Sequence, residues 1–206
     1  MTIKVCGLRD PKNIRKIEKL DVNWLGFIFY RGSQRYVTDD EASVKAINAC
    51  KKIKIGVFVN ETIDTMTATG RLFRLQGLQL HGHESPDVCR ILHNCRWVVI
   101  KAFSIESPAD LSQTAAYSPF CDYFLFDTPC QSYGGSGQRF DWQYLADYKG
   151  TTPFLLSGGL SPDCVKEIRY FYHPQFAGID LNSGFELSPA LKDARLIRKF
   201  INSVRI

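Results

Sequence analysis

A thiol near the amino terminus stands where it could act as a base. Cys6 ends the apolar run Ile3–Cys6, a candidate strand, and Gly7 follows it directly. A thiol is an effective base only when its pKa falls from about 8.5 toward neutrality, which requires positive charge nearby. Lys4 lies two residues earlier, on the same face of the strand, and could supply that charge. The alternative is a small buried cysteine with no chemical role.

A carboxyl group follows a second apolar run much later in the chain. Asp127 comes directly after Tyr123–Phe126 and precedes Thr128 and Pro129. A carboxyl group that emerges from a buried strand can stay protonated and act as a general acid. The alternative is an aspartate that caps a turn or the next helix. Asp127 is therefore the candidate acid beside the candidate base Cys6.

Glycine-rich turns after late strand candidates indicate a ligand with a phosphate group. A ligand can approach the backbone closely where side chains are missing, and adjacent N–H groups can cradle a phosphate, although glycine also serves ordinary turns. Three such turns are present. The first along the chain, Tyr133–Gly137, is expected to be a mobile loop over the site, with a plain linker as the alternative. The candidate phosphate site consists of the other two turns, with Gly158 and Gly159 in one and Asn182, Ser183 and Gly184 in the other.

One arginine and a group of histidines and cysteines complete the candidate residues. Arg35 lies just after the second candidate strand, where its guanidinium could hold a carboxylate through two hydrogen bonds. A solvated loop arginine is the alternative. The group of metal-ligand residue types lacks paired Cys-x-x-Cys units and any recognised zinc spacing, so we expect no metal site there. This group contains His81, His83, Cys89, His93 and Cys95.

The elements that must position these groups recur regularly along the chain. Strands that alternate with helical segments imply parallel pairing, and eight such units can close into a (β/α)₈ (TIM) barrel of the α/β class. The main rival, an open doubly wound sheet, is disfavoured because no G-x-G-x-x-G follows the first strand. The candidate strands are Ile3–Cys6, Trp24–Phe29, Ile53–Val59, Gly77–Leu80, Trp97–Lys101, Cys121–Phe126, Pro153–Leu156 and Phe176–Leu181.

Helical spacing of apolar residues is clearest near the end of the chain. Ser161 and Pro162 open a stretch in which Val165 and Ile168 recur at helical spacing. The segment Lys192–Val204 is predicted to be the closing helix, and one stripe of it carries Leu196, Ile197, Phe200 and Ile201.

Composition restricts the classes of protein that the chain can represent. The 206 residues are 45% hydrophobic, enough for one core, so we expect a single domain over residues 1–206. Seven cysteines without a repeated spacing favour reduced thiols, and no apolar stretch is long enough for a signal sequence or a membrane span. We therefore expect a cytoplasmic protein. A net charge of +5 that is spread along the chain disfavours nucleic-acid binding but suits a small anionic substrate.

Taken together, five sequence blocks resemble the phosphoribosylanthranilate isomerase family of tryptophan biosynthesis along almost the whole chain. Any one block could match by chance, but five in the family's order are specific. The blocks are Lys4–Leu8; Leu25–Tyr30 with Ser33–Tyr36; Leu78–Gly82; Phe126–Thr128 with Tyr133–Gly137 and Phe140–Trp142; and Leu156–Leu160 with Gly178–Gly184.

The resemblance implies an internal redox rearrangement of an anthranilate-bearing phosphosugar without a cofactor. Asp127 would protonate the ribose ring oxygen and open the aminoaldose to a protonated Schiff base, and Cys6 would then remove the proton from C2. The product would be the aminoketose 1-(2-carboxyphenylamino)-1-deoxyribulose 5-phosphate. By similarity, Arg35 would face the anthranilate group, the two glycine turns would hold the phosphate, and Asp180 would order or polarise neighbouring groups.

The sequence also departs from the family pattern, and two alternatives stay open. Asn182 stands where the family commonly has serine, Phe185 replaces a smaller aliphatic residue, and Ala190 with Leu191 replaces a glycine step. One alternative is the related histidine-pathway isomerase, whose base at the first strand is an aspartate. The other is a barrel that binds phosphosugars without catalysis, which would need neither Cys6 nor Asp127. The sequence leaves a monomer and a homodimer equally open.

Overall fold

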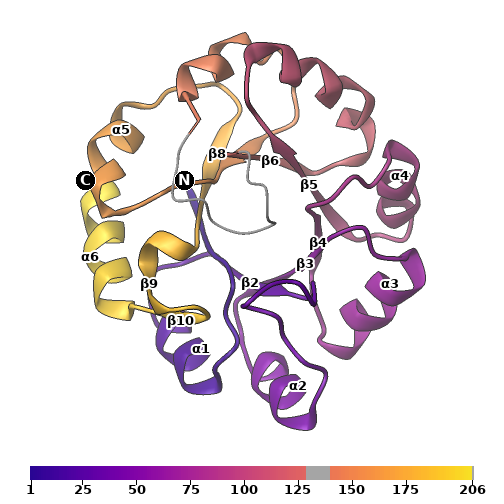
Figure 1. Ribbon diagram of the computed structural model, residues 1–206, viewed down its shortest axis with the longest axis vertical. Coiled ribbons are helices and arrows are strands. Elements are labelled where there is room, and N and C mark those ends of the chain that lie inside the picture. The colour runs from indigo at the N-terminus through magenta and orange to yellow at the C-terminus, as the bar shows by residue number, and fades with distance from the viewer. Residues whose placement is uncertain (129–139, 206) are drawn as a thin grey trace.

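Eight parallel strands close into a barrel in chain order, which excludes the open sheet (Figure 1). The computed structural model describes residues 1–128 and 140–205. Each strand pairs with the next along the chain, and the first pairs with the eighth. The strands are β1 (Thr2–Val5), β2 (Trp24–Ile28), β3 (Ile53–Phe58), β4 (Gly77–Leu80), β5 (Val98–Ser104), β6 (Tyr123–Asp127), β7 (Phe154–Leu156) and β8 (Phe176–Leu181).

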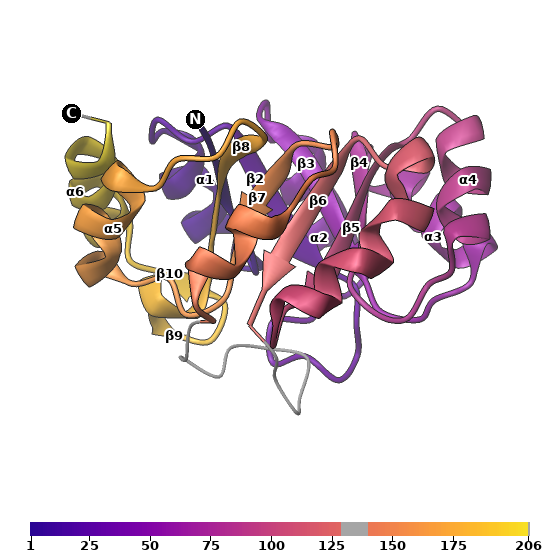
Figure 2. The ribbon, with the colours of Figure 1, turned by 90° about the horizontal axis from the view of Figure 1, so that it is seen from above.

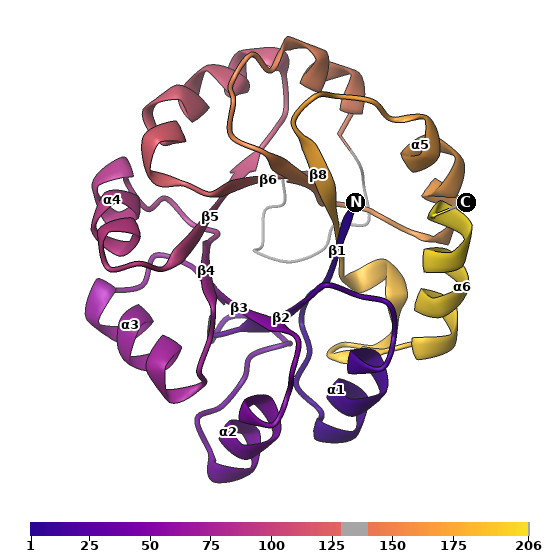
Figure 3. The same cartoon turned by 180° about the vertical axis from the view of Figure 1, so that it is seen from behind.

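Helices surround the barrel on the outside, as Figure 3 shows from the opposite end. Most of the α-helices begin at a side chain that accepts a backbone N–H of the first turn, such as Asp10, Asp40 and Ser85. No helix in the described part of the chain is long and apolar enough to cross a membrane. The α-helices are α1 (Pro11–Glu18), α2 (Glu41–Asn48), α3 (Ile63–Leu72), α4 (Pro86–Asn94), α5 (Val165–Tyr170) and α6 (Ala194–Val204).

Short 3₁₀ helices replace α-helices in the described parts of the connections that follow β5 and β6. In η1, Leu111 and Thr114 are the buried residues, and their spacing of three matches the 3₁₀ period. The helical spacing predicted after Ser161 divides into a 3₁₀ turn and α5. The 3₁₀ helices are η1 (Pro108–Ala116), η2 (Ser118–Phe120), η3 (Trp142–Asp147), η4 (Pro162–Cys164) and η5 (Ser183–Phe185).

The closing helix begins two residues later than its spacing predicts. The side chain of Asp193 accepts the N–H groups of Arg195 and Leu196 and therefore starts α6 at Ala194. Lys192 instead belongs to β10 (Leu191–Lys192), which pairs antiparallel with β9 (Glu186–Ser188). Figure 2 shows this small hairpin at the end of the barrel toward which the arrow of β6 points.

Strand positions agree with the sequence prediction, whereas some strand ends differ by one to three residues. Gly77–Leu80 and Phe176–Leu181 are strands over their whole predicted length. The first strand ends at Val5, so Cys6 lies just beyond it, and Asp127 is the last residue of β6 rather than the residue after it. Both side chains still stand at the carboxyl-terminal rim, the end of a (β/α)₈ barrel where active sites form.

Alternation along the strands separates an outer core from the interior of the barrel. Phe124 and Phe126 belong to the large apolar core between strands and helices, while Leu125 belongs to a smaller, separate cluster. Successive side chains on a strand point to opposite faces, so the smaller cluster fills the barrel. It consists of Trp24, Ile55, Ile100, Ala102, Leu125 and Leu155.

Candidate active site

The same alternation directs the chemically active side chains into the barrel. Ile3 and Val5 pack in the outer core, so Lys4 between them faces inward, and so does Asp180 between Ile179 and Leu181. Lys4 and Asp180 are partners in the β1–β8 register, and Lys4 Nζ lies 2.6 Å from Asp180 Oδ2. This buried ion pair lies inside the barrel, below the rim.

One cavity at the rim receives both candidate catalytic groups. Cys6 comes from the end of β1 and Asp127 from the end of β6, with β7 and β8 standing between these strands in the barrel. Of the residues predicted to take part in catalysis or substrate binding, all except Gly184 line this cavity. The lining includes Cys6, Tyr30, Arg35, Gln79, His81, Ser104, Asp127, Thr128, Ser157, Gly158, Gly159, Asp180, Asn182 and Ser183.

The thiol of Cys6 is almost completely buried, with 3% of the residue exposed. Burial raises the pKa of the Cys6 thiol, while the positive charges of Lys4 and Lys192 oppose the rise and the Asp180 carboxylate adds to it. Lys4 supplies positive charge to the thiol, as its position in the sequence predicts. The effect of burial on the pKa is larger than that of this charge, and the strand pattern could not show it because the pattern does not give the depth of the residue.

Asp127 is partly exposed and is held by two contacts. Its Oδ1 atom accepts the N–H of Thr128 at 2.8 Å, and its Oδ2 atom lies 3.2 Å from His81 Nε2. Of its side chain, 22% is exposed. The carboxyl group is therefore oriented by the protein while it stays accessible from the cavity.

Arg35 lines the cavity but also forms an ion pair with a residue of the small hairpin. Its Nε and Nη2 atoms donate to the two carboxylate oxygens of Glu186 at 2.9 and 2.7 Å. Lys192 Nζ donates to the same carboxylate at 2.7 Å and to Asn182 Oδ1 at 2.6 Å. Burial would raise the pKa of Glu186, but Arg35 and Lys192 together hold it below its ordinary value. A guanidinium has five N–H donors, so Arg35 keeps donors for a ligand beside Glu186.

The two glycine turns lie next to each other, as a shared phosphate site requires. A Cβ atom on Gly158 would come within 2.4 Å of Thr128 N and 2.6 Å of Asp127 Oδ1, so the turn after β7 packs directly on the end of β6. A Cβ atom on Gly184 would stand 2.1 Å from the carbonyl oxygen of Leu160. Gly184 is thus needed for close packing between the turns, while Asn182 and Ser183 face the cavity.

Four residues of this network were not assigned a role from the sequence. Gln79 was named only within the block Leu78–Gly82, and His81 only there and in the group of metal-ligand residue types. Glu186 was not named, and Lys192 was given only as the start of the closing helix. Alternation along β4 could have indicated Gln79, because a glutamine on the inner face of a buried strand needs polar partners. The remaining pairings depend on contacts between distant segments.

Two further predictions concern a metal and a mobile loop. Among residues 1–128 and 140–205, no group of three or more histidine, cysteine, aspartate or glutamate side chains is arranged to hold a metal ion. His81, which belongs to the group of metal-ligand residue types, contacts Asp127. The predicted loop Tyr133–Gly137 lies outside the described residues.

The Ala190 departure has a visible backbone consequence. Ala190 adopts a φ of 67°, in the left-handed region where glycine is favoured. This conformation explains why a glycine suits the step before the last helix. The chain nevertheless keeps the turn, and the Ala190 N–H donates to Glu186 Oε1 at 3.1 Å.

Fold and cavity together define a (β/α)₈ barrel of the kind that carries enzyme active sites at this rim, and here the rim brings a thiol, a carboxyl group and two glycine turns to one cavity. The family model of N-(5'-phosphoribosyl)anthranilate (PRA) isomerase matches residues 3–203. The N-(5'-phosphoribosyl)anthranilate isomerase of Parabacteroides distasonis is 50% identical, over 99% of this chain and 93% of its own length. The chain therefore belongs to the phosphoribosylanthranilate isomerase family.

Solved structures of the family share the whole barrel. Monomers of the dimeric enzyme from Thermotoga maritima superpose with a TM-score of 0.86 at 28% identity, covering 100% of this chain and 98% of that one. A second phosphoribosylanthranilate isomerase, solved in complex with reduced 1-(O-carboxyphenylamino)-1-deoxyribulose 5-phosphate, has a TM-score of 0.82 at 27% identity with the same coverage.

Proposed function

We propose that this chain isomerises N-(5'-phosphoribosyl)anthranilate to 1-(2-carboxyphenylamino)-1-deoxyribulose 5-phosphate, a step of tryptophan biosynthesis. The observation that carries the proposal is the meeting of Cys6 and Asp127 in one cavity, from strands that are not neighbours. A base and an acid on different strands can act on two different atoms of one sugar. The identity of the substrate is inferred from the membership of this chain in the phosphoribosylanthranilate isomerase family.

In the first step, Asp127 donates its proton to the ribose ring oxygen. The bond between C1 and that oxygen breaks, and the nitrogen lone pair forms the C=N bond of a protonated Schiff base. Asp127 suits this role because its carboxyl group is held by Thr128 and His81 and is accessible from the cavity. A positioned acid typically contributes about 10² to 10⁴ to the rate.

In the second step, the thiolate of Cys6 removes the proton from C2. The electron pair of the C–H bond forms a C1–C2 double bond, and the iminium nitrogen accepts the electrons that it displaces. The resulting enolamine tautomerises to the ketone, so C1 is reduced and C2 oxidised within one molecule. The iminium acts as the electron sink, and the chemistry therefore needs no cofactor.

Formation of the thiolate depends on charge that the substrate brings. Burial raises the pKa of Cys6 in the free enzyme despite Lys4 and Lys192. The protonated Schiff base places a positive charge beside the thiol, and an opposite charge within about 4 to 6 Å stabilises an anion in a buried site. The base is thus activated when ring opening has produced the intermediate on which it acts.

Binding of the substrate is assigned to the rim. The backbone N–H groups of Gly158 and Gly159 and the turn Asn182–Gly184 would hold the phosphate, supported by the close packing of the two turns. Arg35 would contact the anthranilate carboxylate through donors that Glu186 leaves available. Asp180 would order the groups around Cys6, since it faces inward and pairs with Lys4.

Both alternative functions fit the chain less well. The histidine-pathway isomerase carries an aspartate where this chain has Cys6. The family model that matches residues 3–203 is that of phosphoribosylanthranilate isomerase. A binding protein without activity needs neither the thiol nor the carboxyl group in its cavity.

The test is a fluorescence assay in which the substrate is generated from anthranilate and phosphoribosyl pyrophosphate. Wild-type protein should remove the anthranilate-type fluorescence without added cofactor. Cys6→Ser and Asp127→Asn should each lower kcat by about 10² to 10⁴ while they still bind the reduced product analogue. Cys95→Ser and Asp147→Asn, which change an exposed thiol and an exposed carboxylate, serve as matched controls. Full activity of either active-site variant would show that the assigned role is wrong.

We also propose a cytoplasmic location for the protein. Free thiols at the described cysteines support a reducing compartment. The Thermotoga relative is described as dimeric, and light scattering of the purified protein would decide between a monomer and a homodimer.

A further inference from the structure

Three side chains lead to the carboxyl group of Asp127 from inside the barrel. Lys4 Nζ donates to Gln79 Oε1 at 2.7 Å, Gln79 Nε2 lies 2.8 Å from His81 Nδ1, and His81 Nε2 lies 3.2 Å from Asp127 Oδ2. Lys4 is fully buried and Gln79 is 1% exposed. The first two members are therefore shielded from water, and each polar atom must find its partner within the protein.

The donors and acceptors in this row of three contacts, from Lys4 through Gln79 and His81 to Asp127, follow from Lys4. An ammonium group only donates, so the atom of Gln79 that faces Lys4 must be the amide oxygen. The amide NH₂ group then faces His81, and His81 Nδ1 must accept from it. A neutral histidine ring that accepts at Nδ1 carries its proton on Nε2, and this N–H donates to the carboxyl oxygen Oδ2 of Asp127.

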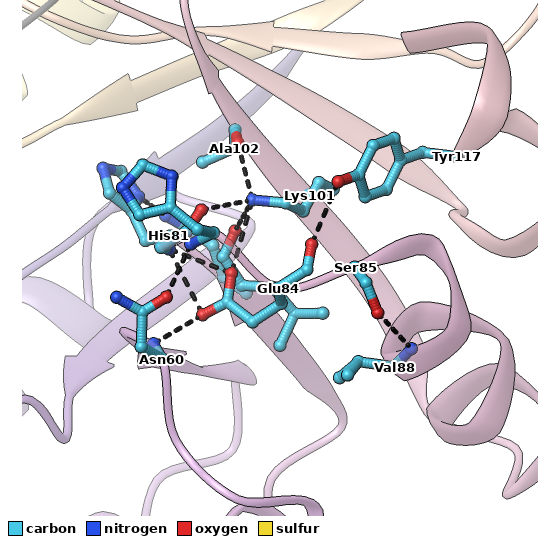
Figure 4. Close-up of polar contacts among 12 residues, drawn as sticks. Asn60, His81, Glu84, Ser85, Val88, Lys101, Ala102 and Tyr117 are labelled. Atoms are coloured by element: carbon cyan, nitrogen blue, oxygen red, sulfur yellow. Dashed lines mark hydrogen bonds and ion pairs between the residues drawn. The ribbon is translucent and has the colours of Figure 1, made fainter. Parts of the chain in front are cut away.

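The backbone around His81 is fixed by a separate buried ion pair. The side chains of Glu84 and Lys101 are 2% and 3% exposed, and Glu84 Oε2 lies 3.3 Å from Lys101 Nζ. Glu84 accepts the N–H groups of Asn60 and Gly82, while Lys101 donates to the carbonyl oxygens on both sides of His81, those of Leu80 and Gly82. Figure 4 shows Glu84 facing Lys101, with Asn60 beside it. The ring of His81 therefore projects from a rigid support.

We propose that Lys4 and Gln79 are positioning residues that hold His81 as a neutral imidazole with its proton on Nε2, directed at Asp127. The inference rests on the proposed role of Asp127 as the acid. A second proton on the ring would sit on Nδ1 and point at the NH₂ group of Gln79, so two donors would oppose each other. This lock of Lys4, Gln79 and His81 thus keeps a neutral N–H donor, rather than a charged ring or a bare ring nitrogen, against the carboxyl group of the proposed acid.

The sharpest perturbation is Gln79→Glu, which keeps the shape of the side chain and removes its donor. The carboxylate can still accept from Lys4, but it now also accepts a proton on Nδ1 of His81, which reverses the lock. A positive or Nδ1-protonated ring next to Asp127 should lower kcat by about 10-fold or more and change KM little, because Arg35 and the two glycine turns that are proposed to bind the substrate are unaltered. Gln113→Glu makes the same chemical change at an exposed position and should leave kcat unchanged.

The protonation state of His81 is measured directly by ¹⁵N–¹H long-range correlation spectra of the imidazole rings. The chain has four histidines, and the His81 signals are those lost in His81→Asn. Wild-type protein should show a neutral ring with the proton on Nε2 at pH 7, and Gln79→Glu should show Nδ1 protonated. A wild-type ring that carries its proton on Nδ1 would overturn the proposal without reference to any variant.

The kinetic and spectroscopic results separate this proposal from the proposed function. If wild-type protein does not isomerise the substrate, the function is wrong, whereas the spectra still report whether the lock exists. If Gln79→Glu shows the protonated Nδ1 but keeps full kcat, the lock has no influence on Asp127 and the positioning role is refuted.

Discussion

A methyl group on Gly26 would crowd the thiol of Cys6. Gly26 lies in the middle of β2, and a Cβ atom there would stand 2.7 Å from Cys6 Sγ and 3.0 Å from Cys6 Cα. Ordinary contacts of a Cβ atom begin at 3.4 Å, so the sulfur must move by about 0.7 Å to reach ordinary contact. The backbone cannot move away easily, because Cys6 N–H donates to Leu181 and Gly7 N–H donates to Gly26.

We therefore expect Gly26→Ala to displace the base without removing it. A misplacement of about 1 Å costs up to about 10² in rate, so kcat should fall by roughly 10-fold to 10²-fold. KM should stay close to the wild-type value, since the phosphate turns and Arg35 belong to other segments. Overpacking should also lower the free energy of unfolding by about 1 to 3 kcal/mol. Steady-state kinetics in the fluorescence assay and urea unfolding measure the two effects.

Gly56→Ala provides a matched control for this experiment. Gly56 lies in the neighbouring strand β3, and a Cβ atom there would meet Leu75 Cδ1 at 2.5 Å, away from Cys6. This variant should lose stability to a similar degree but keep its kcat. A folded Gly26→Ala protein with wild-type kcat would refute the reasoning, and so would an equal loss of kcat in Gly56→Ala.

Two further predictions concern the ion network at the rim. Arg35→Met should chiefly raise KM, because it removes the proposed contact with the anthranilate carboxylate. Arg31→Met, which changes an exposed arginine, is the control. If Arg35→Met has the same KM as this control and the wild-type protein, the proposed contact is wrong. Burial lowers the pKa of Lys192 from 10.5 to about 8. Between these two pH values the unfolded chain binds more protons than the folded protein, so the free energy of unfolding should rise with pH. For the wild-type protein the rise due to Lys192 should be about 2 to 3 kcal/mol. Lys192→Met should lack this rise in urea unfolding followed from pH 7.5 to 10.5, and an identical slope in both proteins would show that Lys192 titrates normally when folded.

The sequence alone determined the architecture and the two central residues. Eight apolar runs with helical segments between them predicted the closed barrel, because such runs and their order along the chain can be read directly from the sequence. The spacing of two residues placed Lys4 on the same strand face as Cys6. The end of the sixth apolar run placed Asp127 at the rim of the barrel, where it lines the cavity. Strand ends were less certain, since the last residue of a strand depends on its neighbour's register.

Only the tertiary structure decided how these groups act on each other. Glu186 contacts Arg35 from 151 residues away, and Lys4 reaches Asp180 across 176 residues. Pairing over such distances depends on which strands and hairpins become neighbours, and burial depth depends on the whole fold. For this reason the sequence could name the thiol but not the rise of its pKa, and could include His81 in a motif without revealing its contact with Asp127.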